Sequence, residues 1–175
     1  RNVDVKILLF NNKIYGLTKG QYSPTSEIGK KTKSSPYGTV DRPFYPISLA
    51  LGAEATFVAR TIDMIPRHLE YTLQRAANHR GVAFVEIYQN CTIFNDAAFK
   101  YASDKEVRDD NLVELEHGKA MIFGKNGDKG IRLASGYRPE IVQMGEGGAS
   151  MHELLIHDEK ATSPAVSGVP SCQRA

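Results

Sequence analysis

Two adjacent asparagines, Asn11 and Asn12, are the residues best placed for chemistry in this chain of 175 residues. They follow a run of mostly branched apolar residues at 3–10, which is typical of a strand buried on both faces of a parallel sheet. Ligands of such sheets bind beyond the carboxyl ends of the strands, so we expect both amides to point into a cleft. An amide oxygen with a nearby backbone carbonyl suits Mg²⁺, which takes oxygen ligands and shares them with phosphates. A plain turn remains the alternative, because asparagine tolerates left-handed backbone angles.

Cys91 is the second candidate for chemistry, since it follows the apolar segment 82–88 and has polar neighbours. A thiolate at the end of a buried strand is well placed to meet a metal. A lone cysteine is more often a buried and inert small hydrophobe, and one thiol cannot hold an iron–sulfur cluster by itself. Both interpretations stay open on the residues alone.

Two segments carry a resemblance to a known family. Residues 11–25, which read Asn-Asn-Lys-Ile-Tyr-Gly-Leu-Thr-Lys-Gly-Gln-Tyr-Ser-Pro-Thr, closely resemble the second half of the thiamine-diphosphate motif in beta subunits of 2-oxoacid:ferredoxin oxidoreductases, specifically the 2-oxoglutarate branch. Residues 81–95 are similar to the next core strand of that family and the loop after it, where a cysteine ligates a [4Fe-4S] cluster. The resemblance implies an α/β fold: part of a thiamine-diphosphate-binding domain with a mostly parallel sheet flanked by helices.

The resemblance also assigns roles to individual residues. It implies that Asn12 gives its side-chain oxygen, and Ile14 its backbone carbonyl, to Mg²⁺, and that Cys91 ligates the [4Fe-4S] cluster. Lys19 is the catalytic candidate, because its ammonium group can pair with a carboxylate of a dianionic substrate. The resemblance further implies that thiamine diphosphate is bound by Asn12, Ile14, Tyr15, Gly16, Leu17 and Thr18. It implies that the 2-oxoacid is bound by Leu17, Thr18, Lys19 and Gln21.

The implied reaction is oxidative decarboxylation of 2-oxoglutarate with coenzyme A to succinyl-coenzyme A, with electrons passing through the cluster to ferredoxin. The family's upstream Gly-Asp-Gly element is absent, so we expect this chain to be the carboxyl-terminal half of a beta subunit, active only in the complete complex with its alpha subunit. Pyruvate or another 2-oxoacid is the alternative substrate. A catalytically silent fragment or structural subunit is the alternative from another functional class.

Charge, hydropathy and cysteine content indicate which partners and which cell compartment to expect. The net charge of +2 is balanced, so nothing indicates a nucleic-acid partner. No apolar stretch approaches the roughly 20 residues that span a bilayer, and no signal peptide opens the chain, so we expect no membrane partner. The two cysteines, Cys91 and Cys172, are far apart, which favours a reducing cytoplasm over a disulfide framework.

Hydrophobic patterns predict the elements that position these residues. After the strand at 3–10 we expect a long loop at 16–46, a helix at 46–52, a strand at 55–60, a helix at 66–79 with Asp63 as its cap, and a strand at 82–88. The helix at 66–79 should be the crossover between two parallel strands.

The carboxyl-terminal region has a different character. We expect a thiamine-diphosphate-binding domain at 1–95, a β-rich appendage at 96–159 and a disordered tail at 160–175. The appendage should hold short strands at 112–116, 120–124, 129–133 and 140–144, followed by a short helix at 150–158.

Overall fold

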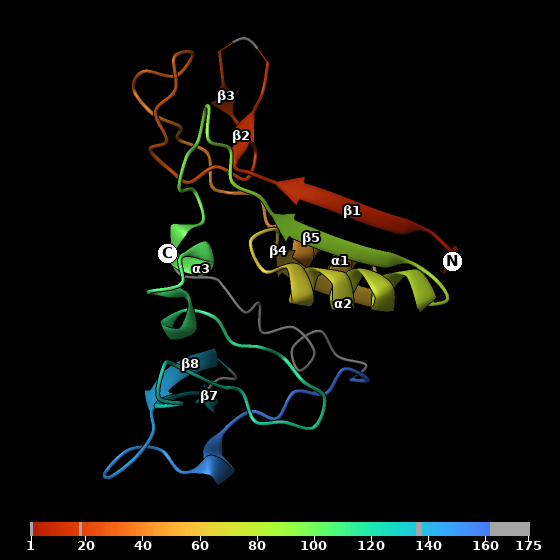
Figure 1. Ribbon diagram of the computed structural model, residues 1–175, viewed down its shortest axis with the longest axis vertical. Coiled ribbons are helices and arrows are strands. Elements are labelled where there is room, and N and C mark those ends of the chain that lie inside the picture. Colours follow the sequence, from red (N-terminus) through yellow and green to blue (C-terminus); the bar gives the residue numbers. More distant parts are fainter. Residues whose placement is uncertain (1, 18, 136–137, 162–175) are drawn as a thin grey trace. The chain divides into compact units, whose positions relative to one another are not determined.

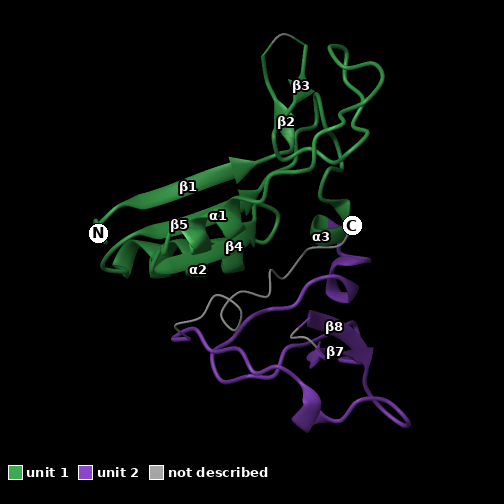
Figure 2. Cartoon of the chain, turned by 180° about the vertical axis from the view of Figure 1, so that it is seen from behind, with its two compact units in different colours: residues 1–103 green, residues 104–175 purple. Residues whose placement is uncertain are grey.

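The computed structural model describes residues 2–17, 19–135 and 138–161. The chain divides into two compact units, residues 1–103 and 104–175 (Figure 2). Thr18 and the expected tail from 162 onward lie outside the described residues. Within the described ranges, no helix is both long enough and apolar enough to cross a membrane.

The first unit is built on a parallel three-stranded sheet. Its strands are β1 (Lys6–Asn11), β4 (Phe57–Ile62) and β5 (Ala83–Tyr88), and β5 lies between the other two (Figure 1). This confirms the predicted parallel crossover, with the first two strands displaced toward the carboxyl terminus from their expected positions. Because the strands are parallel and in register, Asn11, Ile62 and Tyr88 all lie at the same end of the sheet.

Helix α2 (Pro66–Asn78) covers one face of this sheet. Its Ala76 joins Ala83, Val85 and Ile87 of β5 in a buried apolar cluster, with Leu69 and Leu73 of the same helix packed against it. Helix α1 (Pro46–Gly52) also contacts β4 and β5. Both helices occupy their predicted positions and begin at proline, a residue whose fixed φ suits the first turn.

The predicted cap of α2 is wrong. The residue before the helix is Ile65, and no side chain among the described residues caps the first turn. Asp63 instead belongs to the turn after β4, where its backbone N–H donates to the carbonyl of Tyr88 at 3.0 Å. This bond holds Asp63 at the sheet edge, away from the capping position.

The predicted burial of β1 is also wrong. Among the described residues the strand pairs with β5 alone, and its Ile7, Leu8 and Phe10 side chains are 44%, 45% and 58% exposed. An apolar run shows that a strand is suited to burial, but it does not show which neighbours supply the cover. Within the described part of the chain, β1 is therefore an edge strand with an uncovered apolar surface.

A short antiparallel hairpin continues from β1. It consists of β2 (Ile14–Tyr15) and β3 (Gln21–Tyr22), and Figure 1 shows it beyond the carboxyl end of β1. Residues 23–45 of the expected loop have irregular structure. The unit ends in a short helix, α3 (Lys100–Ser103).

The second unit contains the antiparallel strands expected of the appendage. They are β6 (Ile122–Phe123), β7 (Lys129–Ala134) and β8 (Arg138–Gln143), in that order, over a core that includes Met121 and Ile131. Residues 112–116 are not a strand, which corrects the prediction. The expected helix at 150–158 is only a 3₁₀ turn at Met151–Glu153, because the chain after it is extended and pairs with neighbouring segments.

The 3₁₀ turn of the second unit is fixed by a carboxylate. The backbone N–H and hydroxyl of Ser150 donate to Glu153, and Arg132 lies 3.1 Å from it. These donors hold the pKa of Glu153 below its usual value, and the Ser150 N–H has the largest effect.

Candidate functional site

The turn after β1 carries both residues that are expected to ligate magnesium. Asn12 is partly exposed, and its side-chain oxygen accepts the backbone N–H of Ile14 at 3.3 Å. Between them, Lys13 has a φ of 52°, a left-handed conformation that is uncommon for a residue with a side chain. An amide oxygen has two lone pairs, so one long hydrogen bond leaves Asn12 capacity for a cation. The donor set, an amide oxygen and a backbone carbonyl, therefore fits Mg²⁺ as part of a shared coordination sphere.

Asn11 does not point into a cleft, which corrects the prediction. It is 7% exposed, and its side-chain N–H donates to Glu86 at 2.7 Å. Its oxygen accepts the Thr25 hydroxyl at 2.7 Å and the N–H of Lys13 at 3.1 Å. Successive side chains of a strand point to opposite faces, so two adjacent asparagines at a strand end cannot both face one ligand.

Sequence reasoning missed a buried charged pair beneath this turn. Glu86 is 1% exposed, and both Nε and Nη2 of Arg60 donate to its Oε2 atom, at 2.8 and 2.7 Å. The guanidinium group also lies 4.8 Å from the centre of the Tyr88 ring. A glutamate inside an apolar strand was the available signal, because a buried carboxylate requires a charged or hydrogen-bonding partner. The three strands of the sheet are thus linked by Arg60, Glu86 and Asn11.

Two further buried side chains hold the same turn. The Ser26 hydroxyl donates to the carbonyl of Lys13 at 2.7 Å. The Asn95 side-chain N–H₂ donates to the carbonyls of Asn12 and Lys13, at 2.9 and 3.2 Å. Neither residue had been predicted, because contacts between residues so far apart in sequence leave no local pattern.

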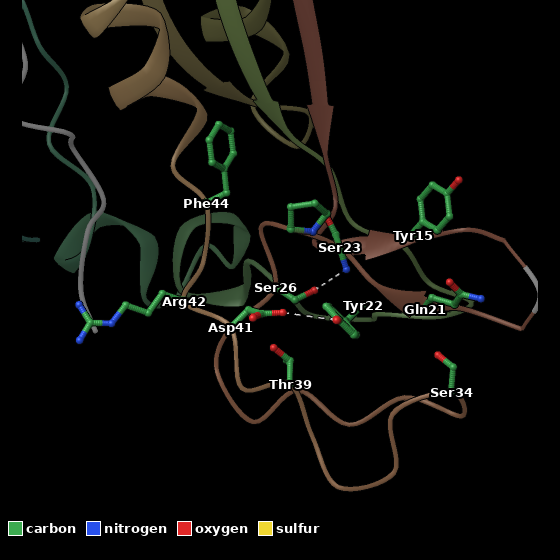
Figure 3. A pocket seen from close by; sticks show the side chains of 11 residues that line it. Tyr15, Gln21, Tyr22, Ser23, Ser26, Ser34, Thr39, Asp41, Arg42 and Phe44 are labelled. Carbon is green, nitrogen blue, oxygen red and sulfur yellow. Dashed lines mark hydrogen bonds between the residues drawn. The ribbon is translucent and has the colours of Figure 1, made fainter.

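The hairpin places two expected residues beside a cleft of about 630 Å³. Tyr15 and Gln21 are paired across the hairpin, and both line this cleft. Figure 3 shows its polar side chains, with Tyr22 donating its hydroxyl to Asp41 at 3.4 Å and the N–H of Ser23 donating to Ser26 at 2.9 Å. The full lining is Tyr15, Gln21, Tyr22, Ser23, Pro24, Ser26, Ser34, Thr39, Asp41, Arg42 and Phe44.

The other expected site residues lie at the hairpin tip and after β5. Gly16, Leu17 and Lys19 are exposed, with Leu17 at 56%, and Thr18 lies outside the described residues. Cys91 is partly buried in the loop that follows β5. The described ranges contain no group of three or more His, Cys, Asp or Glu side chains that could hold a metal ion. Any cluster bound through Cys91 would therefore need ligands from elsewhere.

Several known proteins are similar to this chain. The model of the thiamine pyrophosphate enzyme family, C-terminal TPP binding domain, matches residues 1–87. The chain is 50% identical over 165 residues to the 2-oxoglutarate oxidoreductase subunit KorB of Mycobacterium tuberculosis, covering 94% of this chain and 43% of that protein. It is 46% identical to subunit beta of a 2-oxoacid:ferredoxin oxidoreductase of Aeropyrum pernix, covering 78% of this chain and 46% of that protein.

One solved structure is also similar to this chain. It is the 2-oxoglutarate:ferredoxin oxidoreductase of Magnetococcus marinus with 2-oxoglutarate, coenzyme A and succinyl-CoA bound. The TM-score is 0.56 at 35% identity, covering 66% of this chain and 38% of that chain. The chain thus spans less than half the length of each of these relatives.

Proposed function

The chain belongs to the thiamine pyrophosphate enzyme family, and from this premise we propose that it forms part of the beta subunit of a 2-oxoglutarate:ferredoxin oxidoreductase. The proposed reaction converts 2-oxoglutarate and coenzyme A to succinyl-coenzyme A and carbon dioxide, with ferredoxin as electron acceptor. An alpha subunit completes the enzyme, which works in the cytoplasm.

The observation that carries this proposal is the turn at Asn12 and Ile14. It stands at the carboxyl end of a parallel sheet, where cofactors bind in such folds. It carries the Asn12 side-chain oxygen, which accepts the N–H of Ile14, and the proposed second donor is the Ile14 carbonyl; both are oxygen atoms of the kind that Mg²⁺ takes. Bound thiamine diphosphate would supply the carbanion chemistry that decarboxylates a 2-oxoacid. The residues of this chain would hold the metal and diphosphate through Asn12 and Ile14, while Tyr15 and Gln21 line the adjacent cleft.

Calorimetric titration of the assembled enzyme tests the proposal. After removal of bound cofactor, thiamine diphosphate should bind only when Mg²⁺ is present, and 2-oxoglutarate should then reduce ferredoxin in the presence of coenzyme A. No magnesium-dependent binding would instead support the silent-fragment alternative. Faster turnover with pyruvate than with 2-oxoglutarate would keep the chemistry and change the substrate.

Lys19 is proposed to select the dianionic substrate. It has a φ of 67°, so glycine is accommodated at this position without backbone strain. We expect Lys19→Gly to weaken the affinity for 2-oxoglutarate about ten- to a hundredfold relative to pyruvate, because a charge-assisted hydrogen bond contributes about 1.5–3 kcal/mol. Steady-state kinetics with both substrates measures this ratio. Lys31→Ala, at an exposed lysine outside the motif, is the control. An unchanged substrate ratio in Lys19→Gly would remove the proposed role.

Cys91 is proposed as a ligand of the [4Fe-4S] cluster. We expect Cys91→Ser to lose most of the cluster's visible absorbance and, with it, ferredoxin reduction, because serine is a poor substitute for a thiolate on iron. Iron content and absorbance of the purified complex measure this loss. Thr92→Ala, at the exposed neighbour, should retain the cluster. A fully loaded Cys91→Ser enzyme would show that the ligands are other residues.

A further inference from the structure

The loop after β5 is closed on itself and ends in a buried asparagine. The backbone N–H of Asn95 donates to the carbonyl of Cys91 at 3.0 Å. Asn95 is only 5% exposed, although residues 92–94 between them are exposed. A short exposed loop therefore places one amide side chain inside the protein.

The hydrogen-bonding capacity of Asn95 is directed at the turn after β1. Its N–H₂ donates to the carbonyls of Asn12 and Lys13, at 2.9 and 3.2 Å. Its oxygen accepts a hydrogen bond from the Lys30 ammonium group, which also lies 3.5 Å from Glu27. The lysine thus fixes which end of the amide faces the two carbonyls, since an ammonium group is only a donor.

These contacts act on a backbone that needs support. The left-handed φ of Lys13 disfavours this turn, so surrounding contacts must hold it. The two carbonyls bound by Asn95 belong to consecutive peptide units, and those units link Asn12 to Ile14. Their orientation sets the backbone at Asn12 and the direction of the Ile14 N–H, which the Asn12 side-chain oxygen accepts.

The same loop also supports the hairpin tip. A Cβ atom at Gly20, where φ is 78°, would lie 2.9 Å from Cδ1 of Phe94. The chain immediately after Lys19 therefore packs closely against the loop. Residues 91–95 thus contact both the turn of the candidate magnesium ligands and the hairpin that carries the candidate substrate residues.

From this geometry we propose that Asn95 is a positioning residue for the magnesium–diphosphate site, holding the peptides on both sides of Lys13 so that Asn12 and Ile14 keep their orientation. The inference rests on the proposed function. In this role Asn95 is not itself a ligand, since its amide group is engaged by Lys30 and by the two carbonyls, and it acts through the backbone of the turn. Replacing a residue that supports a metal ligand in this way commonly lowers metal affinity by about 10- to 100-fold.

Asn95→Asp gives the sharpest test, because it preserves size and the acceptor for Lys30. It turns an oxygen toward the two carbonyls in place of the N–H₂ group. We expect the Mg²⁺ concentration for half-maximal binding of thiamine diphosphate to rise about tenfold or more. Calorimetry on the assembled enzyme, at temperatures well below the unfolding midpoint, measures this shift. Asn95→Ala removes the donors without adding charge and should shift the dependence in the same direction.

Two control variants separate positioning from stability and charge. Val85→Ala makes a cavity in the core against α2, and it should lower the unfolding midpoint while leaving the magnesium dependence unchanged. Asn126→Asp introduces the same charge change at an exposed position of the second unit and should alter neither property.

The results separate this inference from the function on which it rests. If wild type binds with magnesium dependence and both Asn95 variants match it, Asn95 supports stability alone and the inference is overturned. If wild type shows no magnesium-dependent binding, the proposed function fails and the inference fails with it. A shift in both Asn95 variants, absent from both controls, supports the positioning role.

Discussion

Asn12→Ala is expected to weaken magnesium-dependent binding of thiamine diphosphate by at least about a hundredfold in the assembled enzyme. The variant removes the only side-chain oxygen that this chain is proposed to give the metal. Mg²⁺ demands near-octahedral oxygen coordination, so water would replace the lost protein ligand. The protein would then no longer fix the position of the metal through this side chain. The loss should exceed that of any residue acting through the backbone, for which about 10- to 100-fold is usual.

Asn12→Asp is the matched variant for this measurement. It retains an oxygen at the same position and adds a negative charge, so magnesium-dependent binding should persist. The Asx-type contact with the N–H of Ile14 can also form with a carboxylate. Calorimetric titration of thiamine diphosphate at several Mg²⁺ concentrations compares the two variants. Equal affinity in wild type and Asn12→Ala would place the metal elsewhere.

Glu86→Ala is expected to cause the largest loss of stability, about 3–5 kcal/mol. The substitution leaves the Arg60 guanidinium, whose side chain is 11% exposed, without the carboxylate that balances its charge. It also removes the acceptor for the Asn11 amide and opens a cavity in the central strand. Thermal unfolding, together with hydrogen exchange of the β5 amides in the assembled enzyme, measures the effect.

A double replacement distinguishes the pair's charge balance from its packing. Glu86→Leu combined with Arg60→Met removes both charges at similar volume, and it should cost much less stability than Glu86→Ala. If the double variant is as unstable as the single one, then the hydrogen bonds of the network matter more than the unpaired charge. An unaffected Glu86→Ala variant would contradict the analysis of this pair.

The sequence predicted the elements whose patterns are local. Helices α1 and α2 begin at their prolines, and α2 carries its apolar residues at helical spacing, so both lie where expected. The strand β5 was recognisable because all of its residues except Glu86 are apolar or aromatic, as is typical of a central strand. The expected strand at 112–116 is irregular. The expected helix at 150–158 is absent because Leu154 and Ile156 form bridges with Arg132 and Ala120, tertiary contacts that local propensity does not encode.

The candidate site was likewise predictable only where its signal is local in the sequence. The motif identified Asn12 and Ile14, and the structure places them on one turn. The orientation of Asn11 was missed because it depends on Glu86, a residue 75 positions away in the chain. The support from Asn95 was missed for the same reason, since its partners lie 82 and 83 positions earlier.

The uncovered apolar surface of β1 should promote self-association of the first unit. An edge strand with exposed isoleucine, leucine and phenylalanine is a template for pairing with a second chain, so residues 1–103 in isolation would tend to self-associate. Cofactor binding measured on such a preparation would depend on protein concentration. The strand that directly precedes the candidate metal ligand Asn12 is also the one whose apolar surface is uncovered, so self-association and cofactor affinity should be coupled in that fragment.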